Sequence, residues 1–302
     1  MAGSESSMTT QRGTSWLPVL VALAVVIVWG ASSVLTKIAA REIDPVVVGM
    51  ARTVLGGIVG APVALAFRIA LPKREHWPAF AVSAFCGFVA FPIMFSIGQR
   101  MTSAMHGGLI LAVLPIFTGL VAAAVEQRRP VKRWWLGCAI AFVGEVVLVT
   151  SRAASGAAAS SLGGDLLILL ASVLAASGYV AGARLTQARY ASLGATLWGI
   201  AAASLVLVPA LPAANAGWSL PAASPLAWAA VVFLAWVTSI IGYIGWYWAL
   251  GQGGIARMGT IQFLQPLSGL VLAFFLLGER PTFPLGIATV LILLGVVIAR
   301  RR

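Results

Sequence analysis

Apolar residues fill long runs along this chain, and polar or charged residues collect in the short stretches between the runs. A helix needs about 20 mostly apolar residues to cross the hydrocarbon core of a bilayer, so each long run predicts one membrane-spanning helix. Charged residues, prolines and glycines mark where the runs end. The pattern predicts ten spans, at residues 16–37, 45–67, 77–98, 103–125, 133–151, 164–184, 194–212, 226–250, 255–277 and 282–299.

The composition agrees with this interpretation and excludes other classes of protein. Of 302 residues, 60% are hydrophobic and 9% are charged, whereas a soluble domain carries about 25% charged residues. Such a chain cannot cover a water-soluble globule, and it is too hydrophobic to be intrinsically disordered. No loop is longer than about 15 residues and no GxxxxGK[ST] motif occurs, so we expect neither a soluble catalytic domain nor direct ATP drive. The sequence predicts an all-α polytopic membrane protein with ten transmembrane helices.

Basic residues are distributed unevenly between the two sides of the membrane. The chain holds 20 Lys and Arg against 8 Asp and Glu, a net charge of +12. With ten spans, 14 basic residues fall on the side of the termini and 5 on the other side, and Arg52 lies within a span. Positive residues favour the cytoplasmic side, so we expect both termini in the cytoplasm and the protein in the plasma (bacterial inner) membrane. The basic residues form no stripe interleaved with aromatic residues, and we predict no nucleic-acid partner.

The N-terminus, the cysteines and the histidines indicate no additional site. The first 15 residues are polar, and we expect residues 1–15 to be a disordered cytoplasmic segment. Cys86 and Cys138 lie in apolar runs without metal-ligand or disulfide spacing. His76 and His106 are 30 residues apart and have no cluster of carboxylates nearby. We therefore expect no metal and no cofactor.

The fourth and ninth spans share a sequence pattern. Each contains a mid-span proline, a GLV triplet after it, and an acidic residue before a second proline. The chain thus divides into two five-helix repeats, residues 16–152 and 162–302. An odd number of spans in each repeat inverts the second repeat in the membrane, an arrangement typical of secondary transporters with a site near the midplane. The matching residues, with the prolines 151 residues apart, are Pro115 and Pro266, Glu126 and Glu279, and Pro130 and Pro281.

Motifs spread over nearly the whole chain resemble the EamA-type branch of the drug/metabolite transporter superfamily. The resemblance rests on Trp29-Gly30 and Lys37 in the first span, Pro45 and Arg52 at the second, Pro115 in the fourth, Gly164-Asp165 opening the sixth, Pro266 with LLGERP in the ninth, and GIATVLILLGVVIARR in the last. It implies ten helices in two inverted five-helix repeats and export of small metabolites, often amino acids, as by exporters of the YddG type. The sixth span departs from the pattern at Ala176 and Ser177, where the family often has a tryptophan.

Ionisable residues inside spans are candidate functional groups because they are costly in a bilayer. Arg52 lies about 7 residues into the second span, where it either meets a substrate carboxylate or is a snorkelling or helix-pairing arginine near the outer boundary. His106, near the outer end of the fourth span, either titrates or binds substrate, or is a packing residue. Glu145, deep in the fifth span, is a candidate proton-coupling residue, with a structural carboxyl group at the periphery as the alternative.

The ninth span also contains a polar pair beside its proline. Gln262 and Gln265 are three residues apart and therefore lie on one helix face. They line a substrate cavity, or they bond neighbouring helices. A proline frees a backbone carbonyl one turn back, so Pro266 and its counterpart Pro115 are predicted helix breaks that act as hinges.

The eighth span is the most aromatic. Trp236, Tyr243 and Tyr247 are spaced 7 and 4 residues apart, which places them on one face of an α-helix. They form a wall for a substrate side chain, or they pack in the core or against lipid. Trp246 and Trp248 are interpreted as interfacial residues. With Tyr179 of the sixth span and Trp29 of the first, the predicted substrate-binding residues are Trp29, Arg52, His106, Tyr179, Trp236, Tyr243, Gln262 and Gln265.

These observations predict a secondary transporter that exports small organic metabolites by alternating access, with amino acids (aromatic or other neutral ones) as the first substrate class. An exporter of another metabolite or drug class is the alternative. A non-transporting scaffold or a membrane enzyme is less well supported, since an enzyme requires convergent catalytic groups. The predicted partners are a small-molecule substrate and the lipid bilayer, and the sequence leaves a homodimer open.

Overall fold

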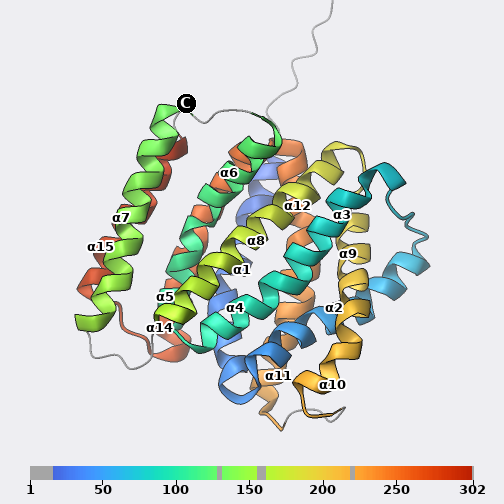
Figure 1. The fold of residues 1–302 in the computed structure, drawn as a ribbon, viewed down its shortest axis with the longest axis horizontal. Helices are drawn as coiled ribbons and strands as arrows, with labels where there is room; N and C mark the ends of the chain where they lie inside the picture. The colour runs from blue at the N-terminus through green and yellow to red at the C-terminus, as the bar shows by residue number, and fades with distance from the viewer. Residues whose placement is uncertain (1–15, 128–130, 155–160, 218–221, 301–302) are drawn as a thin grey trace, which may run out of the picture.

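The computed structural model describes residues 16–127, 131–154, 161–217 and 222–300, which form helices with short connections (Figure 1). No strand occurs within these ranges, so the all-α class is confirmed. The segment 1–15, which we expect to be disordered, lies outside the described residues.

Helical segments follow the predicted apolar runs in order. Residues up to 154 form α1 (Leu17–Glu42), α2 (Pro45–Ala66), α3 (Trp77–Ala84), α4 (Phe91–Arg100), α5 (Ala104–Ile110), α6 (Leu114–Val125) and α7 (Lys132–Ala154). Later residues form α8 (Leu162–Gln187), α9 (Ser192–Leu207), α10 (Leu211–Ala214), α11 (Pro225–Phe233), α12 (Gly242–Gly253), α13 (Ile255–Gly259), α14 (Gln265–Leu277) and α15 (Phe283–Arg300). Short 3₁₀ segments are η1 (Arg74–His76), η3 (Leu111–Val113), η4 (Val208–Ala210) and η6 (Thr260–Leu264), and π-helical segments are η2 (Phe85–Ala90) and η5 (Leu234–Ile241).

Within the described residues, seven helical stretches are long and apolar enough to cross a membrane. Two shorter apolar helices, Gln265–Leu277 and Phe283–Gly295, lie nearer the C-terminus. The seven are Leu17–Glu42, Pro45–Ala66, Arg74–Arg100, Ala104–Val125, Leu162–Gln187, Ser192–Ala214 and Pro225–Gly253.

Polar residues at the helix starts explain several of the helix boundaries. The Asp44 carboxylate accepts a hydrogen bond from the Val46 amide at 2.8 Å, and Pro45 occupies the first turn of α2. Ser161 and Ser224 cap α8 and α11 by accepting from the backbone amide three residues ahead. Such caps satisfy amides that a helix leaves unpaired at its first turn, which is why polar residues interrupt the apolar pattern there.

Helix irregularities recur at corresponding places in the two parts of the chain. The π-helical segment η2 interrupts the run from α3 to α4, and η5 interrupts the run from α11 to α12. The 3₁₀ segment η3 precedes Pro115 at the start of α6, and η6 precedes Pro266 at the start of α14. A 3₁₀ segment thus precedes each proline, and neither proline can donate the backbone bond that would continue an α-helix.

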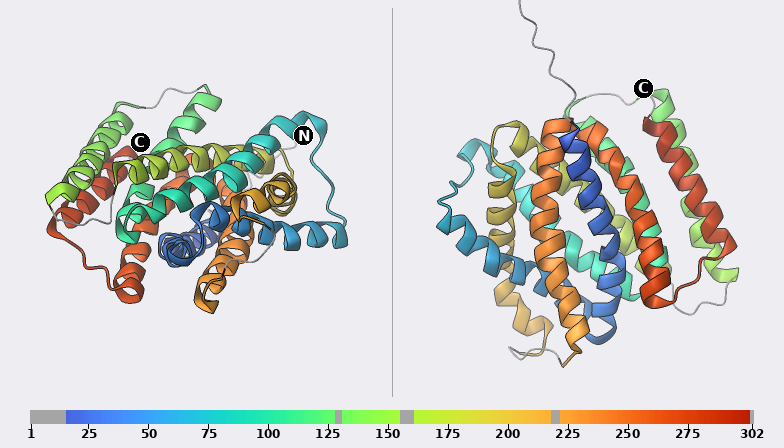
Figure 2. Two further views of the ribbon diagram at one scale, coloured as in Figure 1. Left: turned by 60° about the horizontal axis from the view of Figure 1, so that its bottom comes forward. Right: turned by 180° about the vertical axis from the view of Figure 1, so that it is seen from behind.

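The helices pack as two layers. On the side seen in Figure 1, α8 lies between α3–α4 and α6 and contacts each of them. Figure 2 shows the other side, where α1 lies between α12 and α14. At one edge α2 packs along α9, where a Cβ on Gly56 or Gly60 would collide with the Ile200 side chain. At the other edge α7 packs along α15. Small residues permit such close contact between helices in a membrane, where burial from water supplies no driving force.

Both ends of the described chain lie at one face of the molecule. Figures 1 and 2 show that α1 begins and α15 ends at this face, which we name the terminal face. The start of α3 and the ends of α6 and α8 also lie at the terminal face. The starts of α5 and α8 lie at the opposite face. We name this second face, at which α5 and α8 begin, the opposite face.

Candidate substrate site

Five aromatic side chains, named here the aromatic cluster, fill the interior between the two layers. The Trp29 indole of α1 stacks on the Tyr179 ring of α8, with ring centroids 5.3 Å apart and planes at 13°. Tyr243 and Trp246 of α12 approach Trp29 at centroid distances of 5.4 and 5.3 Å. Phe88 of η2 lies 4.6 Å from Tyr243. Residues before 152 and after 162 both contribute, so the cluster joins the two parts of the chain.

The π-helical segments supply hydrogen-bond acceptors to the cluster. The Trp29 Nε1–H donates to the Thr238 carbonyl oxygen in η5 at 2.9 Å. The Tyr243 hydroxyl donates to the Gly87 carbonyl oxygen in η2 at 3.1 Å. A π-helix replaces i→i+4 bonds locally, which leaves backbone groups for other partners and is common at functional sites. The irregular backbone thus satisfies the buried donors of Trp29 and Tyr243, whereas the Trp246 Nε1–H has no hydrogen-bond partner within the described residues.

Arg52 lies buried beside this cluster, with 3% of its surface exposed. Its Nε–H donates to Ser239 Oγ at 2.7 Å, and its guanidinium carbon lies 5.7 Å from the centroid of the Phe91 ring. Within the described residues, no carboxylate forms an ion pair with Arg52. The side chain does not snorkel, because it is buried in the protein, and its bond to Ser239 pairs α2 with η5, as the helix-pairing interpretation describes. A buried guanidinium without a protein carboxylate is suited to an anionic group of a ligand.

The glutamine pair lies on the other side of Trp29. Gln262 Nε2 donates to Gln265 Oε1 at 3.3 Å, and Gln265 Nε2 donates to the Trp29 carbonyl oxygen at 3.4 Å. The predicted neighbourhood of the two glutamines is confirmed, since η6 is a 3₁₀ segment in which residues three apart align. They bond each other and α1, and so connect the start of α14 to the aromatic cluster.

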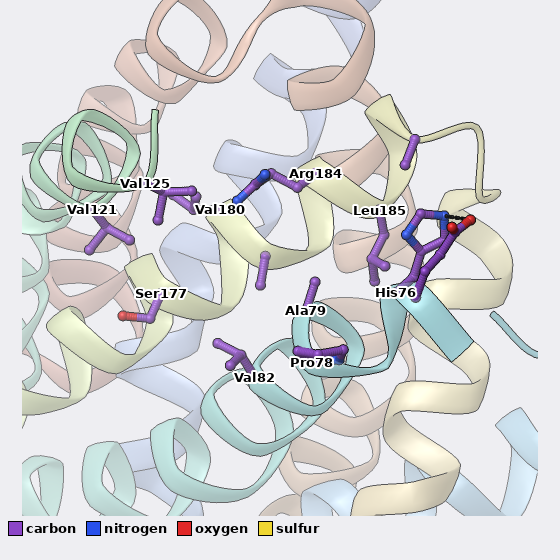
Figure 3. Close-up of a pocket in the computed structure, with 13 residues that line it drawn as sticks. His76, Pro78, Ala79, Val82, Val121, Val125, Ser177, Val180, Arg184 and Leu185 are labelled. Carbon is purple, nitrogen blue, oxygen red and sulfur yellow. Dashed lines mark ion pairs between the residues drawn. The ribbon is translucent and has the colours of Figure 1, made fainter. Parts of the chain in front are cut away.

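A cavity of about 610 Å³ lies beside α8 near the terminal face (Figure 3). Its walls are apolar residues of α3, α6 and α8, including Val82, Val121 and Val180. In Figure 3 the Arg184 side chain extends toward α6 across the cavity. His76 lies near the rim, with its Nε2 3.5 Å from a carboxylate oxygen of Glu75. The cavity combines an apolar wall with charged groups of both signs at the end nearest the terminal face.

The cavity and the aromatic cluster lie on opposite sides of α8. Ser177 and Arg184 line the cavity, whereas Tyr179 belongs to the cluster. Two residues correspond to a rotation of about 200° around an α-helix, so Ser177 and Tyr179 necessarily point in opposite directions. None of the predicted substrate-binding residues is among the 13 residues that line this cavity. α8 therefore separates the cavity from the cluster.

The expected shared face of the eighth span is wrong. Trp236 is 43% exposed and donates its Nε1–H to the Leu55 carbonyl oxygen, while Tyr243 is 1% exposed and lies in the cluster. The π-helix η5 lies between them and changes the angular register that a spacing of 7 residues has in an α-helix. The interfacial interpretation of Trp246 is also wrong, because this side chain is fully buried against Trp29.

His106 does not lie in the cluster. It is buried at the opposite face, where its Nε2 lies 3.2 Å from Asp165 Oδ2. Sequence reasoning did not select Asp165 as a site residue, although Gly164-Asp165 was part of the family motif. The fifth-span candidate Glu145 belongs to α7, and its side chain lies outside the part of the chain that the structure describes.

Comparison with known proteins gives consistent matches along the chain. The model of the EamA-like transporter family matches residues 16–150 and again residues 162–301. The transporter YdeK of Bacillus subtilis is 26% identical over 91% of this chain and 94% of its own length. The "Probable terminal-alkyne amino-acid exporter" of Streptantibioticus cattleyicolor is 27% identical over 84% of this chain and 87% of its own.

Two further comparisons cover nearly the full length. The "Probable amino-acid metabolite efflux pump" of Salmonella typhimurium is 27% identical over 92% of each chain. One solved crystal structure superposes with a TM-score of 0.67 over 93% of this chain and 96% of its own, at 20% identity. This structural likeness concerns the fold alone.

Proposed function

Because the chain belongs to the EamA-like transporter family, we propose that it exports a small zwitterionic metabolite of the amino-acid class by alternating access. The protein is an integral membrane transporter and not an enzyme. The distribution of basic residues supports a plasma-membrane location with both termini cytoplasmic. In that orientation the terminal face is the cytoplasmic face.

The proposed architecture is ten transmembrane helices in two inverted repeats, residues 16–152 and 162–302. The family model matches once in each range. The recurrence of π-helical segments in the third and eighth spans, and of 3₁₀ segments before Pro115 and Pro266, supports the same division. So does the packing of α2 on α9 and of α7 on α15, since a two-fold axis in the membrane brings equivalent helices together.

The observation that carries the proposed substrate class is Arg52 buried next to the aromatic cluster. Its guanidinium binds the substrate carboxylate, and the rings of Trp29, Tyr179 and Tyr243 contact the side chain. Gln265 and backbone carbonyls nearby accept hydrogen bonds from the substrate ammonium group. In the described conformation the rings fill this space themselves, so substrate entry requires the two halves to separate at one end. The amino-acid exporters among the relatives support this class.

The cavity at the terminal face gives the proposed route of entry. Substrate from the cytoplasm reaches the cavity beside Arg184, and rotation of α8 then brings it to the Tyr179 side of the helix. The 3₁₀ segments η3 and η6 with Pro115 and Pro266 act as hinges of the fourth and ninth spans. Trp236 and His106 lie outside the aromatic cluster. They remain predicted substrate contacts only in another conformation, in which they approach the cluster.

Flux in proteoliposomes tests this function. Vesicles are loaded with a labelled neutral or aromatic amino acid. All common amino acids and several hydrophilic drugs are then tested as competitors of its flux. Saturable flux inhibited by a subset of amino acids is expected. Folded protein that transports no amino acid, and transports one of the drugs or another metabolite, would contradict the amino-acid class.

Glu145→Gln is measured in the same assay, since a proton-coupling role for Glu145 predicts that flux no longer depends on a pH gradient. The mass of the detergent-solubilised protein tests the homodimer.

A further inference from the structure

Two ionisable side chains from the two halves meet at the opposite face. His106 of α5 and Asp165 of α8 approach to 3.2 Å between Nε2 and Oδ2, and they are 8% and 3% exposed. His106 precedes residue 152 and Asp165 follows residue 162, so this contact spans the boundary between the halves. Charged or titratable residues inside a membrane protein are costly. A buried pair at the boundary between the two halves is therefore a candidate functional site.

A second contact between the halves lies beside this pair. The Glu279 carboxylate accepts hydrogen bonds from the backbone amides of Ala104 and Met105, at 2.9 and 2.8 Å. These residues immediately precede His106 on α5. Both contacts join α5 to the other half, and a hydrogen bond from the Ser161 amide to the Met101 carbonyl oxygen at 3.0 Å lies at the same face. Opening this face requires both contacts to break.

The elements packed on α5 that carry other charged residues are α1, α4 and the segment that follows α14. From α1 come Arg41 and Lys37, whose Nζ donates to backbone carbonyls at the end of α4, including those of Gln99 and Arg100 at 3.1 Å. Arg100 itself is exposed at the end of α4. Glu279 and Arg280 follow α14, and Glu279 is engaged by the amides of α5. The carboxylate that faces the imidazole is that of Asp165.

We propose that His106 and Asp165 form a proton-binding site that closes the opposite face, and that its proton comes from the solution on that side. Histidine changes its charge between about pH 5 and pH 8. When the imidazole binds a proton, the contact with Asp165 becomes an ion pair in a poorly solvated site and is strengthened. Under this proposal the protonated pair holds the face closed, so acid should favour closure and a rise in pH should favour opening.

The position of the pair determines which solution supplies the proton. Trp29 and Lys37 are eight residues apart on α1, about 12 Å along the helix, so the aromatic cluster lies between the pair and the terminal face. Neither His106 nor Asp165 lines the cavity at that face. The proton binds from the outer solution when this face closes, and it returns to the same solution when the face opens. It therefore sets the rate of gating and does not drive export. This inference rests on the alternating-access function proposed above.

Cysteine labelling of the whole protein in nanodiscs measures opening directly. The background carries Cys86→Ser and Cys138→Ser, and the reporter is Met105→Cys, a buried position at the closed face. Met101→Cys, at an exposed position of the same face, is the control for the intrinsic pH dependence of thiol reactivity. We expect the ratio of the labelling rate at position 105 to the labelling rate at position 101 to increase about fivefold or more when the pH is raised from 5.5 to 8.0. A ratio that stays constant with pH in this parent protein overturns the proposal.

Variants identify the responsible groups. His106→Gln and Asp165→Asn should each give a ratio that is high and independent of pH, while His76→Gln, at the terminal face, should behave as the parent. A pH dependence that survives in His106→Gln overturns the proposal even if the parent responds. Flux of the same proteins in proteoliposomes separates the two claims: pH-dependent labelling without amino-acid flux contradicts only the proposed substrate class. Saturable flux with pH-independent labelling contradicts only the proton site.

Discussion

Helix α8 is held differently at its two ends. At the opposite face Asp165, in its first turn, contacts His106 of the other half. At the terminal face Arg184, near its last turn, lines a cavity of about 610 Å³ between α3 and α6. α8 can therefore pivot, because it is bonded at one end and has free space beside its other end. This difference is the one that alternating access requires.

The largest effect is expected between the two ends, at Arg52. Arg52→Gln removes the guanidinium that binds the substrate carboxylate and should raise the apparent KM for an amino acid roughly 30- to 150-fold, equal to about 2 to 3 kcal/mol. The measurement is concentration-dependent efflux from proteoliposomes. Arg52→Lys is the matched control, which retains the charge and loses the planar fork, and should show an intermediate KM. An unchanged KM in Arg52→Gln contradicts the role of this residue.

The cavity at the terminal face is tested by filling it. Ser177→Trp places a large side chain between α3 and α6 and should slow efflux about tenfold, equal to about 1.4 kcal/mol in the barrier, because α8 loses space to move. Thermal unfolding should remain close to that of the parent. Leu205→Trp, at a position 77% exposed on α9, is the control for an added tryptophan. Equal rates in the two variants would remove the cavity from the transport cycle.

The contact of Glu279 tests the bonded end. Glu279→Gln keeps the shape of the side chain but replaces one acceptor oxygen with an NH₂ donor, so one of the two hydrogen bonds from Ala104 and Met105 is lost and the closed arrangement is weakened by about 1 kcal/mol. The labelling rate at Met105→Cys should then increase about fivefold. Glu75→Gln, at the terminal face, should leave this rate unchanged. An equal increase in both variants would indicate a general loosening and not a contact specific to the opposite face.

A change in thermal stability is expected where α8 packs on the side away from the cavity. A Cβ on Gly182 would collide with the Tyr247 ring, whereas a Cβ on Gly163 makes ordinary contact with Met101. Gly182→Ala should lower the midpoint of thermal unfolding by a few degrees, because overpacking costs about 1 to 3 kcal/mol. Gly163→Ala should have no such effect. If both variants unfold like the parent, α8 is held less tightly on this side than the structure indicates.

The sequence predicted the helices more reliably than the contacts between them. Long apolar runs located the helical segments, and Pro115 and Pro266 located the breaks, because these signals are local. The angular position of Trp236 was wrong, since the π-helix η5 changes the register and leaves no simple pattern in the sequence. The contact between His106 and Asp165 joins residues 59 apart, and no local pattern predicts such a pairing. Burial of Trp246 likewise depends on where α1 and α8 lie around it.

Distances at the two faces test the central claim most directly. Spin labels at positions 82 and 125 lie across the cavity, and labels at positions 101 and 280 lie at the opposite face; all four side chains are exposed. Distance distributions are measured in nanodiscs with and without a saturating amino acid. The account predicts that substrate shortens the 82–125 distance and lengthens the 101–280 distance together. A change of both distances in the same direction, or of neither in a protein shown to transport that amino acid, would contradict alternating access about α8.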